Sequence, residues 1–468
     1  MKHKKSECIL SSINGQGSKN QVLILGGGFG GVYAALQFEK LLRRRPDLEV
    51  TLVSRDNFFL FTPMLHEIAA SDLELNAIVN PLRKMLHRVG TFIGTVERID
   101  MANKQVSVAH GFDNHSHDLH YDHLILALGC GTNFFNLPGI EGSALPFKNL
   151  ADAAELRNRL ISSIEEASSE CAMEERQPLL TFVVAGGGFA GVETLGAIND
   201  FVREAIRFYP NLHNDYVRMV LVTPDELILP ELGAKLGAYA QRKLLSRGIE
   251  IITHARVKAV TNAGIELTTG AIVPSNTLVW TAGTAAHPML AALPLPNERG
   301  RIKVDQFLQV PGFSGLWAVG DCALIPDTLT GGFQPPTAQH AIREGRAAAC
   351  NVVAEIEGRR KEPFRFSALG RLAAIGRRTG VANILGINFA GFFAWWLWRT
   401  IYLSKLPGLE KKVRVALDWT LDLCFSKDFA CIRSGAKSGA ARSVALHSEP
   451  GGEAIADNSP TRIIAAAG

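Results

Sequence analysis

Two glycine clusters are the residues of this chain whose spacing points most directly to chemistry. Gly26, Gly28 and Gly31 have the pattern GxGxxG directly after the apolar run VLIL. The same pattern recurs after FVVA, at Gly186, Gly188 and Gly191. The first glycine of such a motif permits a tight turn, the second lets the backbone approach a pyrophosphate, and the third lets a helix pack closely on a strand. Since that helix directs its N-terminus at the phosphates, each cluster predicts a dinucleotide site.

Short apolar, β-branched runs surround these clusters and are typical of buried parallel strands. Further strands are expected at Glu49–Val53, Val217–Val222, His123–Ala127, Thr277–Trp280 and Leu316–Val319. The last three end at the turns LGCG, TAG and GD, which contain Gly129, Gly283 and Asp321. Open α/β sheets bind ligands at the carboxyl ends of their strands. The pattern therefore predicts an α/β fold with two Rossmann-like dinucleotide-binding domains.

Composition excludes several other classes of protein. The chain has 468 residues, of which 47% are hydrophobic and 20% charged, so it is not a disordered chain. A net charge of +4 gives no reason to expect nucleic acid as a partner. The seven cysteines include no CxxC pair, which argues against a disulfide framework and a zinc knuckle. The first twenty residues contain no apolar run typical of a secretory signal, so we expect a cytosol-facing protein.

The two nucleotide sites are assigned by their order and by the residues after each second strand. The site near the N-terminus is expected to bind FAD and the second NADH, because two sites in one fold suit an electron donor and an electron relay. An acidic ribose ligand is expected after each second strand. Ser54 occupies that position in the first domain, with Asp56 two residues later, and Thr223 occupies it in the second. Since no basic residue lies between Thr223 and Leu229, NADH is favoured over NADPH.

Two carboxylates near these motifs each have two interpretations. Asp321 in WAVGDC could accept hydrogen bonds from a polyol such as the flavin ribityl chain, which we favour, or it could cap a helix. Glu193 follows the second motif by two residues and would lie in the first helical turn. The helix dipole is a sufficient structural reason for a carboxylate there. A role at the nicotinamide end of the site is an equal alternative.

Histidines and free cysteines are expected to contribute less. The segment 105–123 resembles a hairpin with five histidines at positions 110, 115, 117, 120 and 123, but their spacing matches no known ligand signature. We interpret it as a solvated hairpin tip and expect no metal site. His66 and His340 are interpreted as packing or capping residues, and Cys130 and Cys322 as small apolar side chains.

The C-terminal part of the chain has a different character. Residues 358–415 contain twelve Lys or Arg and two acidic residues, and 379–398 carry no charge. The first half of the uncharged run suits a strand pair, and Phe389–Leu403 suits an aromatic helix too short to span a bilayer. An amphipathic helix is expected from Gly408 to Phe425. The pattern predicts membrane docking through 380–431 without a span, with a dimer interface or a core as the alternative.

These motifs together resemble the type II, non-proton-pumping NADH:quinone oxidoreductases of the two-dinucleotide-binding-domain flavoproteins. The resemblance extends from Gln21 to Asp428 and is carried by LGGGFGG, NFFLFTPMLHE, LALG, AGGGFAGVE, WTAG, AVGDCA and PPTAQHAIREG. It implies that a peripheral membrane flavoenzyme passes electrons from NADH through FAD to a lipid quinone. It also implies a place on the cytoplasmic face of the inner (cell) membrane, and a homodimer is conceivable.

The resemblance also implies roles for individual residues. Pro63 and Met64 would lie near the flavin ring, and Ala338 and Gln339 would begin a helix that faces the flavin and the quinone. Glu193 and Gln339 are the expected catalytic residues. Cofactor contacts are expected at Gly26, Gly28, Gly30, Gly31, Ser54, Pro63, Gly129, Asp321, Ala338, Gly186, Gly188, Gly191 and Gly283. The chain departs from the family pattern at Ser54 and Thr223, which replace acids, and at Arg343, which replaces Gln or Glu.

The expected domains follow from these assignments. Residues 21–150 and 300–370 would form a discontinuous FAD-binding domain, 151–299 the NADH-binding domain and 371–431 the membrane-associated region, between disordered tails at 1–20 and 432–468. The nearest rival function is a sulfide:quinone oxidoreductase or another FAD-dependent NAD(P)H oxidoreductase. A sulfide:quinone oxidoreductase needs paired cysteines near the flavin, and that family lacks an NADH site. A flavin-binding scaffold without turnover is a rival of another class.

Overall fold

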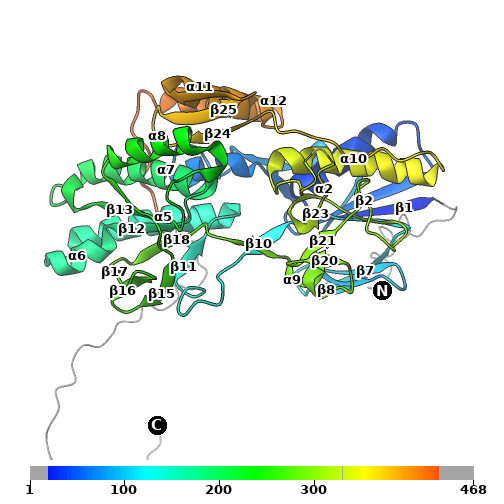
Figure 1. Ribbon diagram of the computed structural model, residues 1–468, viewed down its shortest axis with the longest axis horizontal. Coiled ribbons are helices and arrows are strands. Elements are labelled where there is room, and N and C mark those ends of the chain that lie inside the picture. The colour runs from blue at the N-terminus through cyan, green and yellow to red at the C-terminus, as the bar shows by residue number, and fades with distance from the viewer. Residues whose placement is uncertain (1–18, 329, 432–468) are drawn as a thin grey trace, which may run out of the picture. The chain divides into compact units, whose positions relative to one another are not determined.

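The computed structural model describes residues 19–328 and 330–431 (Figure 1). The predicted disordered tails, 1–20 and 432–468, lie outside the described residues except for Lys19 and Asn20. Strand β1 already begins at Asn20, one residue before the expected domain boundary.

The first sheet is parallel and contains the first glycine cluster. Its strand order is β22-β9-β1-β2-β5. The bounds are β1 Asn20–Leu25, β2 Leu48–Ser54, β5 Gly90–Ile93, β9 His123–Leu126 and β22 Leu316–Ala318. The inner strands β1, β2 and β9 and the edge strand β22 are largely apolar and buried, as the continuous hydrophobic runs predicted, whereas the edge strand β5 is only partly buried. Because β22 belongs to this sheet, the chain returns to the first sheet after it has formed the second.

Two helices pack against each other beside this sheet. Helix α2 (Phe29–Leu41) follows β1, and helix α10 (Ala338–Ile356) lies beside it (Figure 1). A Cβ at Gly345 of α10 would lie 2.1 Å from the carbonyl oxygen of Gly30 in α2. Glycine at that position therefore sets the close approach of the two helices.

The second parallel sheet contains the second glycine cluster. Its order is β11-β18-β12-β13-β14. The bounds are β11 Ala144–Pro146, β12 Thr181–Ala185, β13 Arg218–Val222, β14 Ile249–Ile252 and β18 Thr277–Trp280. Strand β11 pairs with β18, although the expected boundary at residue 150 places it in the first domain. The chain thus enters the second sheet at Ala144, before the expected boundary, with β11 as an edge strand.

Smaller sheets attach to both domains, and their strands pair antiparallel except for the parallel pair β21 and β23. The predicted hairpin is present as β7 (Gln105–His110) and β8 (His115–His120), with β6 (Thr95–Asp100) as a third strand. The remaining strands of these sheets are β3 Phe58–Leu60, β4 Val79–Pro81, β10 Cys130–Thr132, β15 Val257–Thr261, β16 Gly264–Leu267, β17 Ile272–Val273, β19 Thr284–Ala286, β20 Asn297–Glu298, β21 Arg301–Lys303 and β23 Ala323–Leu324.

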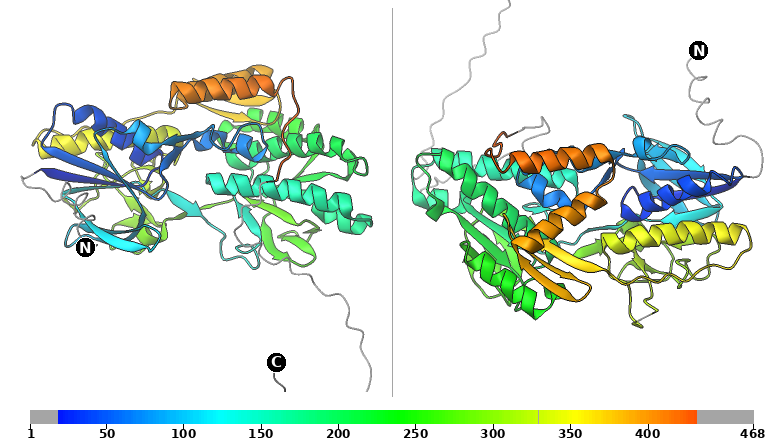
Figure 2. Two further views of the ribbon diagram at one scale, coloured as in Figure 1. Left: turned by 180° about the vertical axis from the view of Figure 1, so that it is seen from behind. Right: turned by 90° about the horizontal axis from the view of Figure 1, so that it is seen from above.

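The C-terminal region forms a small sheet and two helices. Strands β24 (Gly370–Ala374), β25 (Gly380–Ile384) and β26 (Ile387–Gly391) are antiparallel neighbours, so the expected strand pair is present with a third strand. Helices α11 (Phe392–Lys405) and α12 (Leu409–Leu421) follow (Figure 2). Within residues 19–328 and 330–431, every helix is too short or too polar to cross a bilayer.

The other helices connect these sheets. α7 (Phe189–Ala205) follows the second glycine cluster, as α2 follows the first. The remaining α-helices are α3 Leu65–Ala69, α4 Leu82–Met85, α5 Leu150–Ser169, α6 Met173–Leu179, α8 Ala234–Leu245 and α9 Pro288–Ala291.

Candidate active site

The first glycine cluster forms a turn that has room for a ligand at one position. A Cβ at Gly26 would lie 2.2 Å from the Ala127 carbonyl oxygen, and one at Gly31 would lie 1.9 Å from that of Gly26. Gly28, by contrast, has no heavy atom within 4 Å of the place where its Cβ would stand. Gly28 is also the N-cap of α2, whose first turn has no acidic residue and no side-chain cap. The helix N-terminus and the open side of Gly28 therefore form a cradle for an anion such as a pyrophosphate.

A cavity of ≈ 1190 Å³ adjoins this cradle. It exceeds the roughly 300–1,000 Å³ of most small-molecule sites, so a dinucleotide fits. Gly26, Gly28, Ser54, Asp56 and Gly129 are among the residues that line it. These residues, predicted from separate motifs, thus share one cavity, and the polar and glycine-rich lining suits FAD.

Ser54 has a packing role in addition to the predicted ribose contact. Its hydroxyl donates a hydrogen bond of 2.7 Å to the carbonyl oxygen of Asp56. A Cβ at Gly27 would lie 2.2 Å from Ser54 Oγ, so serine and glycine fit together at the end of β2. A ribose contact by Ser54 or Asp56 stays a prediction.

Asp321 is connected to the same cavity through Cys130. Asp321 lies in the turn Gly320–Cys322 after β22, and its Oδ2 accepts a hydrogen bond of 3.3 Å from the Cys130 thiol. Cys130 lines the cavity. Burial, followed by the nearby carboxylate of Asp321, raises the pKa of the Cys130 thiol, so it stays protonated. The thiol is a hydrogen-bond donor here rather than a nucleophile.

Other predicted contacts lie around the cavity rather than in its lining. Gly30 faces Val319, which a Cβ would approach to 3.1 Å. Pro63 lies in the 3₁₀ turn Thr62–Met64, of which only Thr62 lines the cavity. Gly283 has φ of +80°, and a Cβ there would meet the ring of Phe135 at 2.5 Å. A backbone or packing requirement therefore explains glycine at positions 30 and 283 without a cofactor.

The second glycine cluster repeats the geometry of the first. A Cβ at Gly186 would lie 2.5 Å from Thr281 Oγ1, and one at Gly191 would lie 2.0 Å from the Gly186 carbonyl oxygen. Gly188 again has no heavy atom within 4 Å and is the N-cap of α7. Thr223 stands where Ser54 stands in the first domain, 2.5 Å from a Cβ at Gly187. The hydroxyl residues that replace the family's acids thus both pack against the middle glycine of their own cluster.

Ala338 and Gln339 begin α10 as expected. Thr337 is the N-cap, and its side chain accepts from the backbone N–H of His340. Gln339 Nε2 donates a hydrogen bond of 2.9 Å to the carbonyl oxygen of Gly370 in β24. His340 is buried, and its burial lowers its pKa to about 4, so it is a neutral packing residue. Gln339 therefore connects the first domain to the C-terminal sheet.

Glu193 is enclosed between the second domain and the C-terminal region. Its Oε1 accepts a hydrogen bond of 3.0 Å from the backbone N–H of Ala374 in β24 and one of 2.9 Å from the indole of Trp398 in α11. Burial raises the pKa of Glu193 to about 8. The carboxyl group is therefore mostly protonated at neutral pH. The expectation that Glu193 lies in the first turn of its helix is wrong, because α7 begins at Phe189 and its first turn contains no acidic residue, so the helix dipole does not explain this carboxyl group.

A second buried carboxyl group lies beside Glu193 and was not singled out from the sequence. Glu67 in α3 has a pKa raised to about 8 by burial, and its Oε2 accepts a hydrogen bond of 3.1 Å from the indole of Trp419. Both glutamates line a small cavity of ≈ 40 Å³ together with Arg399 and Lys427. A charged residue inside the apolar segment PMLHEIAA was the available signal.

Two basic side chains complete this buried cluster. Lys427 Nζ lies 2.6 Å from Asp72 Oδ1, and the Arg399 guanidinium lies 4.0 Å from Glu67 Oε1. The Arg399 guanidinium also stacks over the rings of Trp395 and Trp419. Buried ionisable groups held this way are characteristic of functional sites, although structural ion pairs share the feature.

The cysteines of the described residues give no redox pair. Cys130, Cys171, Cys322, Cys350, Cys424 and Cys431 are all free. Cys322 is buried, and burial raises its pKa to about 12. Cys350 contacts Gln37, and Cys431 contacts Ser162, so these thiols lie in separate surroundings.

Known proteins share both the sequence and the fold. Residues 20–345 match the family described as pyridine nucleotide-disulphide oxidoreductase, and residues 369–428 match the NDH2 C-terminal domain. Type II NADH:quinone oxidoreductase Ndh of Mycobacterium tuberculosis is 32% identical over 86% of this chain and 88% of its own length. Demethylphylloquinone reductase NdbB of Synechocystis is 30% identical over 86% of this chain and 96% of its own length.

Solved structures at 20% identity support the fold alone. NDH2 from Plasmodium falciparum in complex with NADH superposes with a TM-score of 0.81, covering 88% of this chain and 100% of that one. The sulfide:quinone oxidoreductase of Aquifex aeolicus superposes with a TM-score of 0.64, and the match covers 84% of this chain and 94% of that one. The fold is thus common to both functions considered from the sequence. With the family match over most of its length and relatives of at least 30% identity, the chain belongs to the pyridine nucleotide-disulphide oxidoreductases and, within them, to the type II NADH:quinone oxidoreductase family.

Proposed function

We propose that this chain transfers electrons from NADH to a lipid quinone, with FAD as the bound flavin. The observation that carries the proposal is the matched geometry of the two glycine cradles, since Gly28 and Gly188 are both open at a helix N-terminus. Two such cradles suit one dinucleotide that stays bound as a cofactor and a second that binds and dissociates in each turnover. Membership of the family supports the same direction of transfer.

The residues around the first cavity would hold FAD. Gly28 and the N-terminus of α2 would bind its pyrophosphate, Ser54 would bind the ribose, and Asp321 would bind the ribityl chain. Gly28, Ser54 and Cys130 line the cavity, and Asp321 accepts the hydrogen bond from the Cys130 thiol. When bound, the flavin accepts a hydride from the nicotinamide and passes two electrons on to the quinone. The chain's own task is to orient both substrates and to manage protons.

Glu193 and Gln339 are proposed to act on the quinone side. Quinone reduction consumes two protons, and Glu193 is a carboxyl group kept protonated by burial near neutral pH. The two hydrogen bonds from Ala374 and Trp398 both end on Oε1, so they hold the carboxyl group in one orientation. Gln339 lies at the start of α10, and the family resemblance implies that this helix end would face the quinone. We therefore propose that Glu193 stores a proton and that Gln339 positions the ring.

Sulfide:quinone oxidation is disfavoured by the same observations. Such an enzyme needs two cysteines that act together at the flavin, and Cys130 is occupied with Asp321 and Lys148. It would also have no use for the complete cradle at Gly186–Gly191. A scaffold without turnover would bind flavin but would not bleach it with NADH.

A spectroscopic experiment tests the proposal. The full-length protein should be yellow, and anaerobic NADH should bleach its flavin absorption, which a short-chain quinone should then restore. Sulfide with no NADH should leave the spectrum unchanged. Bleaching by sulfide but not by NADH would contradict the proposal, and so would bleaching by NADH without restoration by quinone. Mass spectrometry of the released flavin tests whether it is FAD.

Membrane docking through residues 380–431 is a second part of the proposal. Large apolar side chains lie on the outside of both C-terminal helices, each at least 48% exposed. They are Phe392, Phe393 and Trp396 of α11 and Leu409, Val413, Leu417 and Leu421 of α12. The helices contact one another beside the C-terminal sheet, as Figure 2 shows. An exposed apolar surface of this kind marks an interaction site.

A bilayer surface suits this patch better than a second copy of the chain. Lys405, Lys411 and Lys412 flank the apolar residues, and each basic residue near an anionic leaflet contributes about 1 kcal/mol. Lys412 remains beside the helices, because its Nζ donates a hydrogen bond of 2.8 Å to the Ser404 carbonyl oxygen. A lipid quinone also has to reach the flavin from the bilayer. We therefore propose peripheral attachment at the cytoplasmic face of the inner membrane, with homodimerisation as the alternative use of the patch.

Sedimentation with anionic vesicles tests the docking surface. Wild-type protein should sediment with vesicles that contain phosphatidylglycerol, and Leu409→Ser/Leu417→Ser should remain in the supernatant. Ile272→Ser is a matched control, because Ile272 is a similarly exposed apolar residue in β17 of the second domain. Equal sedimentation of all three proteins would contradict docking through α12. A dimer that dissociates in the double variant, with no vesicle binding in the wild type, would assign the patch to homodimerisation.

A further inference from the structure

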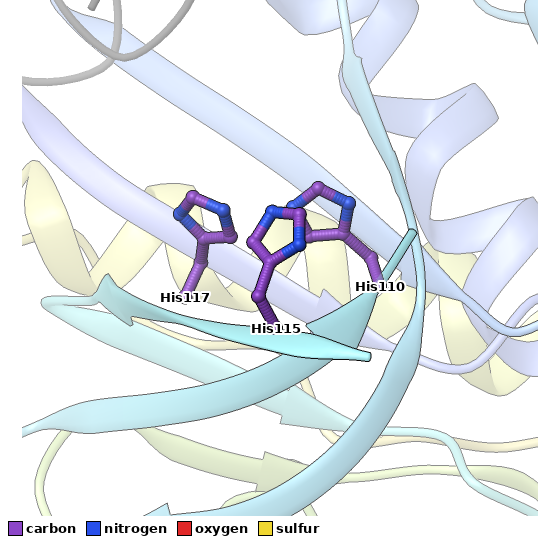
Figure 3. A group of neighbouring side chains, drawn as sticks. All are labelled: His110, His115 and His117. Carbon is purple, nitrogen blue, oxygen red and sulfur yellow. The ribbon is translucent and has the colours of Figure 1, made fainter. Parts of the chain in front are cut away.

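The hairpin β7–β8 brings three of the five clustered histidines together. His110 is the direct cross-strand partner of His115, and His117 is two residues further along β8. Side chains two apart in a strand point to the same face, so all three rings lie on one face of the hairpin. Figure 3 shows the three imidazoles gathered on that side. Their ring centroids are 4.1 to 4.9 Å apart.

The pairing register separates these three from the other two histidines. His120 lies opposite Gln105, with its Nε2 3.0 Å from the Gln105 side-chain nitrogen, and belongs to the other face of the hairpin. His123 is a buried residue of β9 in the parallel sheet. The spacing of the histidines along the sequence therefore showed no ligand pattern, because the pairing of β7 with β8 decides which histidines are neighbours.

Surrounding residues hold the cluster at the rim of the hairpin. The inner part of the same face is apolar, with Val106 and Val108 fully buried. Phe92 of β5 contacts the ring of His110 edge-on at 5.0 Å and that of His117 at 6.1 Å. His110 and His117 are half-buried, and His115 is exposed. The cluster is thus backed by protein on one side and open to solvent on the other.

We propose that His110, His115 and His117 form a three-imidazole site for a late first-row divalent cation such as Zn²⁺. One ring nitrogen from each of the three lies within 4.8 Å of the others. Zn²⁺ binds imidazole nitrogen at about 2.0–2.1 Å, which places two tetrahedral ligands about 3.4 Å apart. Small rotations of the three side chains close the difference. Imidazole ligands select this class of metal over Mg²⁺ and Ca²⁺, which prefer oxygen.

Asp113 supplies the support that a metal-binding histidine commonly has. Its Oδ1 lies 2.6 Å from Nδ1 of His115, which leaves Nε2 of that ring for the metal. A carboxylate at the other ring nitrogen fixes the orientation of a ligating imidazole and raises its basicity. Gly111, with φ of +81°, makes the turn possible, since a Cβ there would lie 2.9 Å from Asp113 Oδ1. Three ligands with an open solvent side leave a fourth position for water.

The site lies next to a segment that lines the first nucleotide cavity. Gly94 lies two residues after Phe92, and a Cβ at Gly94 would meet Cβ of His110 at 3.2 Å. Gly94, Thr95 and Val96 line the cavity. A bound ion would therefore tie the hairpin turn to the edge of the first domain beside that cavity. The expected consequence is greater thermal stability of the hairpin and of the adjoining cavity wall.

Metal titration of the full-length, tag-free protein tests the site. After chelation and removal of the chelator, Co²⁺ should bind at one equivalent per chain with the visible absorption of a four-coordinate ion, and Zn²⁺ should displace it. His117→Gln removes one ligand. Asp113→Asn should weaken binding by about 10–100-fold, as is typical when a supporting carboxylate is lost, and His117→Gln by at least as much.

His120→Gln is the matched control, because it removes a histidine from the same strand but from the opposite face. It should bind Co²⁺ as the wild type does, and Zn²⁺ should raise the melting temperature of wild type and His120→Gln but not of His117→Gln. Equal Co²⁺ affinities in all variants, equal losses in His117→Gln and His120→Gln, or no binding by the wild type would overturn the proposal. The circular dichroism of each metal-free variant establishes that it is folded.

Discussion

The Oε1 atom of Glu193 accepts a hydrogen bond of 2.9 Å from the indole nitrogen of Trp398, 205 residues away. The contact joins α7, just beyond its first turn and behind the second glycine cradle, to the aromatic helix α11, which carries part of the exposed apolar patch. Trp398 itself is fully buried and also contacts the rings of His66 and Tyr402. The proposed nucleotide side and the proposed membrane side of the molecule thus meet at one protonatable carboxyl group.

Replacement of that carboxyl group should slow quinone reduction without loss of flavin. Glu193→Gln keeps the shape and the hydrogen-bond acceptor but removes the proton donor, so kcat with NADH and quinone should fall by about 100-fold, as expected when one general acid is lost. The pKa of about 8 means that wild-type turnover should decline as pH rises through 8. In Glu193→Gln that decline should be absent.

The same substitution has a matched stability effect. Because the folded-state pKa of Glu193 is raised, the folded protein binds more protons than the unfolded chain between about pH 4.5 and 8. Wild-type stability is therefore lost as pH rises through this window, and Glu193→Gln should gain in melting temperature relative to wild type toward pH 8. Identical kinetics and a constant difference in melting temperature would leave Glu193 with a packing role only.

Trp398→Phe should destabilise the protein by about 1–3 kcal/mol, because it leaves a buried acceptor with one donor fewer. Chemical denaturation monitored by circular dichroism measures the change. Trp396→Phe is the control on the same helix, since Trp396 is 48% exposed. A loss of equal size in both variants would mean that aromatic bulk in α11, rather than the bond to Glu193, stabilises the fold.

The two glycine cradles should be separable by matched substitutions. Gly28→Ala and Gly188→Ala both add a methyl group where no protein atom lies within 4 Å, so both should fold. Gly28→Ala should be purified with little flavin, because the methyl group occupies the expected pyrophosphate position. Gly188→Ala should keep its flavin and show a kcat/KM for NADH at least about 10-fold lower, equal to about 1.4 kcal/mol. Flavin loss in Gly188→Ala alone would reverse the assignment of the two sites.

Asp321→Ala should also be purified without flavin. The carboxylate is an acceptor beside the cavity, and a charge-assisted hydrogen bond contributes roughly 1.5–3 kcal/mol. The ratio of absorption at 450 nm and 280 nm reports occupancy. Cys130→Ser is the control, because it retains a hydrogen-bond donor to Asp321 and should keep its flavin. Full flavin occupancy in Asp321→Ala would refute the role of Asp321 in flavin binding.

NADH should be the better donor. No basic residue lies between Thr223 and Leu229, and the Thr223 side chain is fully buried against Gly187. A 2′-phosphate would therefore meet no cation supplied by this turn. Steady-state kcat/KM values should be higher with NADH, and an equal or higher value with NADPH would contradict the assignment.

Local sequence patterns determined much of the fold and of the nucleotide sites. The strand, glycine turn and helix of each cradle lie within a short stretch, so backbone sterics at Gly26 and Gly186 and the apolar runs before them predict the geometry almost unaided. Thr277–Trp280 was predicted as a strand with the bounds that β18 has. The strand pair, the aromatic helix and the amphipathic helix of the C-terminal region follow from hydrophobic periodicity and glycine placement in the same way.

Contacts between distant segments decided the rest. Glu67, Glu193 and Trp398 come from α3, α7 and α11, and the pKa of each carboxyl group depends on burial that only their packing creates. Strand β11 pairs with β18 at the edge of the second sheet, and no pattern in its three residues predicts this pairing. The three histidines at the hairpin rim meet because antiparallel register selects which residues share a face. Linear spacing carries no information about neighbours across a strand or between helices, so protonation states and the histidine cluster were left to the tertiary structure.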